Sequence, residues 1–449
     1  MIPLHDIARR LAAGETSSTA LIDTALSHAQ APDGEGRRVF TRLYADRARA
    51  DAAAGDRARQ AGRSGGTLAG LPISIKDLFD VAGETTWAGS TVLRDALPAK
   101  EDAAIVARLR AAGAIIVGKT NMTEFAFTGL GLNPHYGTPL NPYDRATGRI
   151  PGGSSSGAGV SVTDGMAAAA IGTDTGGSVR IPAALTGLVG FKPTQRRVPL
   201  AGAFPLSPSL DSIGPLAPSV ACCALLDAVL AGATPEIPDA RPVSGLRLAA
   251  PQRYVLDDLD RNVAQAFAQA LARLSRAGAT ITEIAFAELE ALPGINRQGG
   301  IVGYEAYAIH AERMARRGAE YDPRVLARIR RSREITAAGY EDLRAARRDL
   351  IARAAAVTVP FDAVVLPSVA QIAPALRDLE ADDSRYGKAN LLMLRNPGIA
   401  NFLDRCAITI PCHAPGAAPV GLMLMGEHNA DRTLLALARG IEACLLGGG

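Results

Sequence analysis

Short apolar runs alternate with amphipathic stretches along much of the chain. Apolar positions spaced three or four residues apart predict helices, and runs of about four to eight apolar or β-branched residues predict strands. Helices are expected over residues 4–13, 18–29, 102–112, 262–277 and 431–446, and strands over residues 71–75, 114–117, 279–285 and 361–367. Helices that alternate with short strands are typical of an α/β fold with a largely parallel sheet, in which functional loops follow the carboxyl ends of the strands.

Composition and charge narrow the class of protein. At 449 residues the chain is long enough for about three average domains, and its 48% hydrophobic content excludes a disordered chain. The formal net charge of +3 is too small to indicate binding to nucleic acid or to an anionic membrane. No apolar run of about 18 residues predicts a membrane helix, and residues 1–15 lack the apolar segment of a signal peptide. Residues 235–242 are the best candidate for an exposed connecting segment.

Cysteine and histidine usage argues against a disulfide-bonded protein and against a metalloprotein. The five cysteines are odd in number and form no CxxC pair, which predicts a reduced, cytoplasmic protein. The six histidines are scattered without HxH or HExxH spacing, so no metal site is expected.

Two glycine motifs match known patterns but lie in the wrong context. Residues 113–120 match the phosphate-binding pattern GxxxxGK[ST], yet a predicted helix precedes Gly113 and the variable positions, Ala-Ile-Ile-Val, form a strand pattern. Ser155 lies at the centre of a GxSxG motif, yet residues 145–151 before it are predicted to form a loop, whereas a nucleophile elbow follows a hydrophobic strand. No downstream histidine lies in a convincing site motif. We therefore expect neither a nucleotide loop nor a histidine-based triad.

The segment 151–193 is the most informative part of the chain. It holds two Gly-Gly-Ser units whose serines, Ser154 and Ser178, lie 24 positions apart (178 − 154). Glycine allows tight turns whose N–H groups can bind an anion, and a serine beside such a turn suits acyl transfer. Without a histidine, a buried and neutral lysine can act as the base, and Lys76 follows the apolar run 71–75 directly. From spacing alone, a salt bridge from Lys76 to Asp77 or Asp80 is an equal alternative.

These residues resemble the amidase signature family. The strongest segments are Gly70-Leu-Pro-Ile-Ser-Ile-Lys76-Asp77, Val117-Gly-Lys-Thr-Asn-Met-Thr-Glu-Phe-Ala126, Gly137-Thr-Pro-Leu-Asn-Pro142, both serine motifs and Pro419-Val-Gly-Leu-Met-Leu-Met-Gly426. The resemblance covers most of the chain. It implies a single domain over residues 1–449, with a signature core at about residues 69–193. The implied fold is an α/β/α sandwich with one large twisted mixed sheet flanked by helices.

The resemblance also implies a Ser–cis-Ser–Lys triad. Lys76 would be the base, Ser154 the bridging serine after a cis Gly153–Ser154 bond, and Ser178 the nucleophile. The oxyanion hole would be formed by the backbone N–H groups of Thr175, Gly176, Gly177 and Ser178. The sequence departs from the family at Ala158, where a serine is common. For Arg180, two positions after the second serine, we favour a structural role over binding of a substrate carboxylate.

The function implied is hydrolysis of a carboxylic amide, with esters and carbamates as further substrates of the family. The expected binding partner is a small-molecule amide. We expect no cofactor, no metal, no direct binding to nucleic acid and no association with a membrane, and the family suggests a homodimer. An apolar acyl or aryl pocket is expected around Phe125, Phe127, Leu130 and Leu132, unless these are core residues. Three alternatives stay open: the amidase subunit of a tRNA-dependent amidotransferase, a hydrolase of urea-derived acids such as allophanate or biuret-type compounds, and a nucleotide-binding module.

Overall fold

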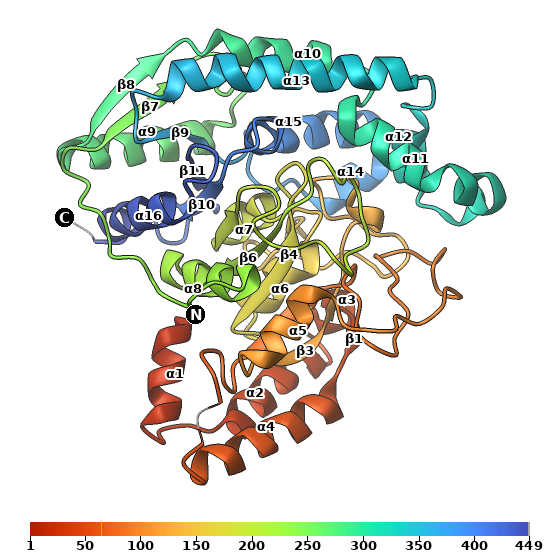
Figure 1. The fold of residues 1–449 in the computed structure, drawn as a ribbon, viewed down its shortest axis with the longest axis vertical. Helices are drawn as coiled ribbons and strands as arrows, with labels where there is room; N and C mark the ends of the chain where they lie inside the picture. Colours follow the sequence, from red (N-terminus) through yellow and green to blue (C-terminus); the bar gives the residue numbers. More distant parts are fainter. Residues whose placement is uncertain (64, 448–449) are drawn as a thin grey trace.

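The computed structural model describes residues 1–63 and 65–447, within which one 11-stranded sheet organises the chain (Figure 1). In spatial order the strands are β1 (Phe40–Leu43), β3 (Ile115–Thr120), β2 (Pro72–Lys76), β4 (Ala169–Thr173), β6 (Ile213–Ala217), β5 (Val189–Lys192), β10 (Ala407–Pro411), β11 (Gly421–Met425), β9 (Ala363–Pro367), β7 (Arg247–Pro251) and β8 (Thr280–Ile284).

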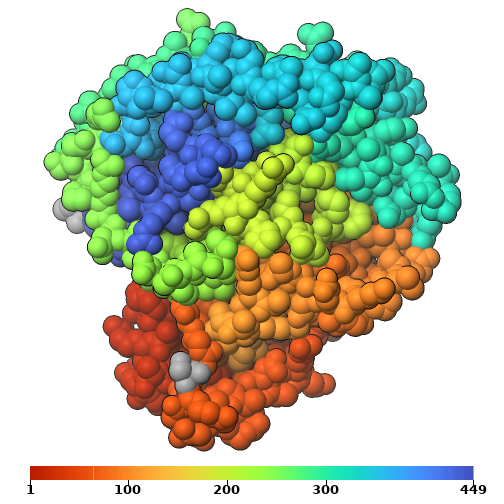
Figure 2. All heavy atoms as spheres, viewed as in Figure 1, coloured from red at the N-terminus to blue at the C-terminus, as the bar shows by residue number. Residues whose placement is uncertain are grey.

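Helices pack on the sheet and form the parts of the molecule beyond it at both ends. They are α1 (Leu4–Ala12), α2 (Ser18–Gln30), α3 (Gly36–Val39), α4 (Ala45–Gln60), α5 (Ala104–Ala111), α6 (Ser156–Thr163), α7 (Arg180–Thr186), α8 (Val220–Ala231), α9 (Arg261–Arg276), α10 (Leu292–Ile295), α11 (Gly300–Arg317), α12 (Pro323–Arg330), α13 (Ala337–Thr358), α14 (Leu376–Ala381), α15 (Asp383–Phe402) and α16 (Asp431–Leu446). In Figure 2 the red and orange N-terminal segments form one end of the molecule, and the cyan segments that include α13 form the other.

The sheet is mixed, so the largely parallel sheet expected from the alternation of helices and strands is wrong. Among the described residues, four of the ten strand pairings are parallel: β2 with β3, β2 with β4, β7 with β8 and β7 with β9. In the middle, β5 pairs antiparallel with both β6 and β10. The mixed α/β architecture implied by the sequence resemblance is confirmed.

Alternation along the strands places two apolar layers on opposite faces of the sheet. In β11, Leu422 and Leu424 face the cluster that includes α5, α8, α9 and α16, whereas Met423 and Met425 face the cluster that includes α13 and α15. Successive side chains of a strand point to opposite faces, so both faces of β11 are buried. This explains why its sequence is a continuous apolar run rather than an alternation of apolar and polar residues.

The elements expected from local patterns are present, with ends displaced by at most three residues. The second helix, α2, is capped by Ser17, whose side chain accepts a hydrogen bond from Ala20 N–H. The strand expected at 71–75 is β2, and it ends on Lys76. Residues 235–242 form an irregular, mostly exposed connection between α8 and β7. None of the helices in the described parts of the chain is long and apolar enough to cross a membrane.

Candidate active site

Lys76 lies at the carboxyl end of β2, between β3 and β4, and is fully buried. Its Nζ is hydrogen-bonded to Ser154 Oγ at 2.7 Å and to Thr173 Oγ1 at 2.9 Å. Burial lowers the pKa of Lys76 to about 7, against the opposing effect of the carboxylates of Asp174 and Asp211. At neutral pH a large share of this amine is therefore unprotonated.

The alternative salt bridges of Lys76 are absent from the described chain. The Asp77 carboxylate accepts a hydrogen bond from Gly89 N–H at 3.0 Å, and Asp80 accepts one from Thr86 Oγ1 at 2.6 Å. The side chain of Lys76 instead extends to the first serine motif, as the triad model expects.

Ser154 is held in place by the loop that follows β3. The Gly153–Ser154 peptide bond is cis. Thr123 N–H donates to Ser154 O at 3.0 Å, and Gly153 N–H donates to Gly129 O at 2.9 Å. A Cβ on Gly153 would lie 2.5 Å from Gly131 N, so only glycine allows this approach of the two backbones. The loop therefore fixes the Ser154 hydroxyl against Lys76.

Ser178 lies just before α7 and is 3% exposed. Ser155 N–H donates to Ser178 O at 3.3 Å, which places the two serine motifs side by side. The preceding Gly177 has φ 121°, and a Cβ there would lie 2.6 Å from Pro397 Cγ. Glycine at position 177 is thus required by both the backbone conformation and the packing.

The resemblance assigns an oxyanion hole to four backbone N–H groups at and before Ser178, and one of them already donates to a protein acceptor. Gly177 N–H donates to Asp174 Oδ1 at 2.8 Å. Within the described chain, the N–H groups of Thr175, Gly176 and Ser178 donate to no protein acceptor. The Thr175 side chain is fixed by a 2.5 Å hydrogen bond to Asp211 Oδ1. These three groups are available to bind an oxyanion.

Arg180 is fully buried and has a structural role, as favoured from the sequence. Its Nε and Nη2 donate to the two oxygens of Asp174 at 3.0 and 2.9 Å, and Nη2 also donates to Asn401 Oδ1 at 2.7 Å. Burial alone would raise the pKa of Asp174, but the Arg180 guanidinium holds it well below its usual range. With its donors directed at protein groups, Arg180 is not placed to bind a substrate carboxylate.

The two misleading motifs have the structures expected of them. The segment Ile115–Thr120 is strand β3, preceded by α5, so it forms no phosphate-binding loop. Ser155 is buried, and its Oγ has no hydrogen-bond partner in the described chain. The three histidines downstream of it bond elsewhere: His310 to Tyr321 Oη, His413 to Val420 and His428 to Asp404.

The pocket expected around four apolar residues is not formed by them. Phe125, Phe127, Leu130 and Leu132 are at most 6% exposed and belong to the hydrophobic core. Apolar residues near a catalytic motif have the same sequence signature whether they line a cavity or fill the interior, which is why the prediction failed. Residues 1–63 and 65–447 hold no group of three His, Cys, Asp or Glu side chains that could bind a metal ion.

Four residues of the site were missed by sequence reasoning. Thr173, Asp174, Asp211 and Asn401 connect Lys76, the Ser178 loop and Arg180. Thr173 and Asp174 lie in the segment already selected, at the carboxyl end of β4, so strand-end position was a usable signal. Asp211 and Asn401 come from distant parts of the chain and carried no local signal.

The chain matches a known protein family over most of its length. Residues 24–435 match the family model described as Amidase. The chain is 39% identical to 2-amino-5-chloromuconic acid deaminase of Comamonas testosteroni, covering 99% of this chain and 96% of the relative. It is 35% identical to a subunit of the glutamyl-tRNA(Gln) amidotransferase of Anaeromyxobacter dehalogenans (strain 2CP-C), covering 98% of this chain and 95% of that relative.

Among solved structures, a crystal structure of an amidase superposes with a TM-score of 0.89 at 34% identity, covering 99% of this chain and all of that one. The family match, the full-length relatives and the shared fold confirm the resemblance identified in the sequence. The chain belongs to the amidase signature family of hydrolases, enzymes that act on carbon–nitrogen bonds.

Proposed function

We propose that the chain hydrolyses a carboxylic amide through a covalent acyl-serine intermediate, with Lys76 as base, Ser154 as proton relay and Ser178 as nucleophile. The observation that carries the proposal is the 2.7 Å contact between Ser154 Oγ and the buried Lys76 Nζ, whose pKa is lowered to about 7. A buried amine of that pKa is suited to general-base catalysis near neutral pH.

In the acylation step, neutral Lys76 takes the proton of the Ser154 hydroxyl, and Ser154 takes the proton of the Ser178 hydroxyl. Ser178 Oγ attacks the carbonyl carbon, and the carbonyl electron pair moves onto oxygen. The N–H groups of Thr175, Gly176 and Ser178 stabilise that oxyanion. Removal of one such donor typically costs about 3–4 kcal/mol in transition-state energy.

Collapse of the tetrahedral intermediate breaks the carbon–nitrogen bond. The leaving amine takes a proton from Ser154, which regains one from the Lys76 ammonium. Water then attacks the acyl-serine by the same route, with its proton passing to Lys76 through Ser154 and finally back to Ser178 Oγ. The products are a carboxylic acid and an amine or ammonia, and the enzyme returns to its starting state. Esters and carbamates fit the same sequence of steps.

The test uses a fluorophosphonate probe, which reports an activated serine without knowledge of the substrate. Labelling is expected on Ser178, mapped by mass spectrometry, and it should be lost in Lys76→Ala and Ser154→Ala. Turnover of a panel of simple amides should be abolished in Ser178→Ala and reduced by orders of magnitude in the other two variants. Near-normal activity in any of the three variants, or labelling of Ser155, contradicts the assignment.

A second candidate is favoured by the 39% identity to 2-amino-5-chloromuconic acid deaminase. Under this candidate the site would release ammonia from an aminomuconic-type acid. Ammonia release from 2-aminomuconic acid, compared with release from simple amides, distinguishes the two.

The similarity to a component of a glutamyl-tRNA(Gln) amidotransferase keeps a partner-dependent activity open, and co-purification with partner proteins from the native host would reveal it. The expected homodimer stays a prediction, for which light scattering is the measurement.

A further inference from the structure

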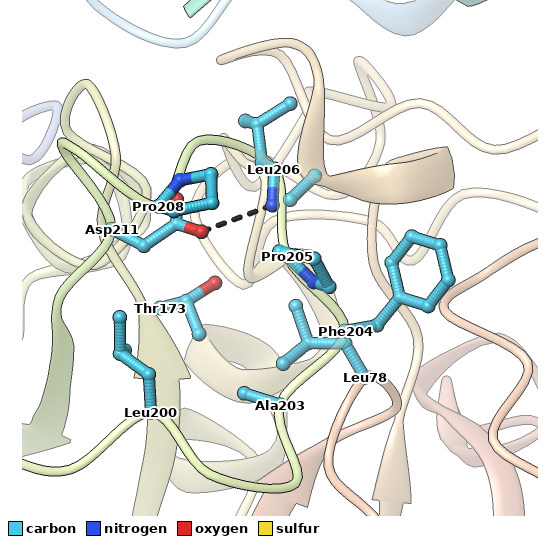
Figure 3. A pocket seen from close by; sticks show the side chains of 10 residues that line it. Leu78, Thr173, Leu200, Ala203, Phe204, Pro205, Leu206, Pro208 and Asp211 are labelled. Atoms are coloured by element: carbon cyan, nitrogen blue, oxygen red, sulfur yellow. Dashed lines mark hydrogen bonds between the residues drawn. The ribbon is translucent and has the colours of Figure 1, made fainter. Parts of the chain in front are cut away.

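A small cavity lies beside the candidate site. Its volume is about 130 Å³, and Figure 3 shows the side chains that line it. Its apolar lining includes Leu78, Ala126, Leu200, Ala203, Phe204 and Leu206, together with two prolines of the same loop. An engineered apolar cavity of about 150 Å³ holds one benzene ring, so this space is large enough for a compact apolar group.

The cavity borders the candidate site through its two polar residues. Thr173 lines the cavity and its Oγ1 is hydrogen-bonded to Lys76 Nζ at 2.9 Å. Asp211 also lines the cavity and is hydrogen-bonded to Thr175, one of the candidate oxyanion residues. A group that fills the cavity therefore lies against Thr173, which contacts the base, and against Asp211, which contacts the loop before Ser178.

These polar residues offer little to an incoming ligand, because their hydrogen bonds are already made. Thr175 donates to Asp211 Oδ1, while Leu206 and Ser207 N–H groups donate to Oδ2, each at 3.0 Å. Figure 3 shows the contact between Asp211 and Leu206. A charged or strongly polar ligand would have to compete with these bonds, whereas an apolar group displaces none of them.

The walls are fixed from outside the cavity. Phe204 N–H donates to Leu78 O at 2.9 Å, which ties the loop to the segment that follows Lys76. On the other side, Glu305 of α11 accepts hydrogen bonds from Ser207 Oγ at 2.5 Å and Ser209 N–H at 3.1 Å. Because both ends of the loop are anchored, the cavity is expected to discriminate between groups by size.

We propose that this cavity is the subsite for a compact apolar group of the substrate, a single aromatic ring or a chain of up to about six carbons, next to the scissile bond. The inference rests on the proposed function at Ser178. The apolar group can belong to the acyl half or to the amine half of the amide, and the experiment distinguishes the two.

The experiment measures binding by calorimetry to the Ser178→Ala chain, so it needs no turnover. Hexanamide and benzamide carry the apolar group on the acyl side, N-butylacetamide and N-benzylacetamide carry it on the amine side, and acetamide lacks it. Ala203→Leu fills the cavity with three additional carbons, and Leu200→Ala enlarges it. Ala201→Leu is the matched control, since residue 201 is exposed on the same loop and does not line the cavity.

One apolar series is expected to bind more tightly than acetamide, by about fourfold per buried methylene. Ala203→Leu should weaken that series at least about tenfold, Ala201→Leu should leave it within twofold, and Leu200→Ala should shift the preference towards larger groups. The series that responds identifies the half of the substrate that occupies the cavity.

The proposal is overturned if neither series gains affinity over acetamide, or if Ala203→Leu and Leu200→Ala both leave the order of affinities unchanged. The proposed chemistry fails separately, when Ser178→Ala retains turnover, and that result would not alter the binding pattern. The two failures are thus distinguishable.

Discussion

The pKa of Lys76 predicts a specific dependence of nucleophile reactivity on pH. With a pKa of about 7, about one tenth of the lysine is neutral at pH 6, about half at pH 7 and about nine tenths at pH 8. If the neutral amine is the base, the rate of reaction at Ser178 should rise about tenfold from pH 6 to pH 8 and then level off. A lysine with its ordinary pKa of 10.5 would give a rate that still rises tenfold per pH unit at pH 9.

The assay is the second-order rate of fluorophosphonate labelling of Ser178 between pH 5.5 and about 9.5, with Ser178→Ala as the blank. The groups that influence Lys76 are the carboxylates of Asp174 and Asp211, which raise its pKa against burial, and its hydrogen-bond partners Ser154 and Thr173. Asp211→Asn removes one of the two negative charges. Its midpoint should therefore move below that of the wild-type chain.

Two results would refute the reasoning. A rate that is flat from pH 6 to 9 would mean that the base is already neutral or is not Lys76. A rate that still climbs through pH 9 would mean that Lys76 keeps an ordinary pKa in spite of its burial. The Asp211→Asn midpoint adds an independent check, because a shift to higher pH contradicts the assigned sign of the carboxylate effect.

Three further outcomes follow from the same contacts. Lys76→Met should unfold at a higher urea concentration than the wild-type chain at pH 7. Because Lys76 regains its ordinary pKa on unfolding, the buried lysine lowers the free energy of unfolding by about 4 kcal/mol at pH 7, an effect that fades as pH rises to 10.5. The variant loses two hydrogen bonds of about 1 kcal/mol each, so its net gain in stability is about 2 kcal/mol, and a less stable variant would argue against a buried neutral amine. Arg180→Met leaves Asp174 buried without its partner and should cost about 3–5 kcal/mol in urea unfolding, whereas Arg353→Met, which breaks an exposed pair, should cost under about 1 kcal/mol; equal effects would contradict the buried-pair interpretation. Gly177→Ala, at φ 121°, should reduce kcat by two orders of magnitude or more, while Gly176→Ala, whose Cβ would meet only Leu394 at 3.7 Å, should stay within about tenfold; similar kcat values in the two variants would remove the steric argument.

Local sequence drew attention to the residues of the candidate site, whereas the choice of Lys76 as a base over a salt bridge came from the family resemblance. Lys76 was selected because it follows an apolar run, and the two serines because each follows a pair of glycines. The structure brings Lys76 and Ser154 into contact. What local patterns could not provide was the order of strands. Pairing of β5 with β10 joins segments far apart in the chain, and neither strand carries a signal of its partner or direction.

The same limit applies to the environment of the site. Asp211 and Asn401 are ordinary polar residues in sequence, and only the fold places them beside Thr175 and Arg180. The cavity wall was misassigned for a related reason. Phe125 and Leu206 are both apolar and buried, but one fills the core and the other faces a cavity, a difference that depends on packing and not on residue type.

Arg180 connects the stability of the site to its chemistry, although it is directed away from any substrate. A fully ionised, unpaired carboxylate at position 174 would favour the ammonium form of Lys76 and keep the base protonated at pH 7. The Arg180 guanidinium, bound to both oxygens of Asp174, offsets that negative charge. The Arg180→Met chain should therefore show, besides its lower stability, a labelling profile displaced to higher pH, measured without urea at a temperature where the variant stays folded. If its midpoint stays that of the wild type, Arg180 acts on the fold alone and the low pKa of Lys76 is due to burial without help from this pair.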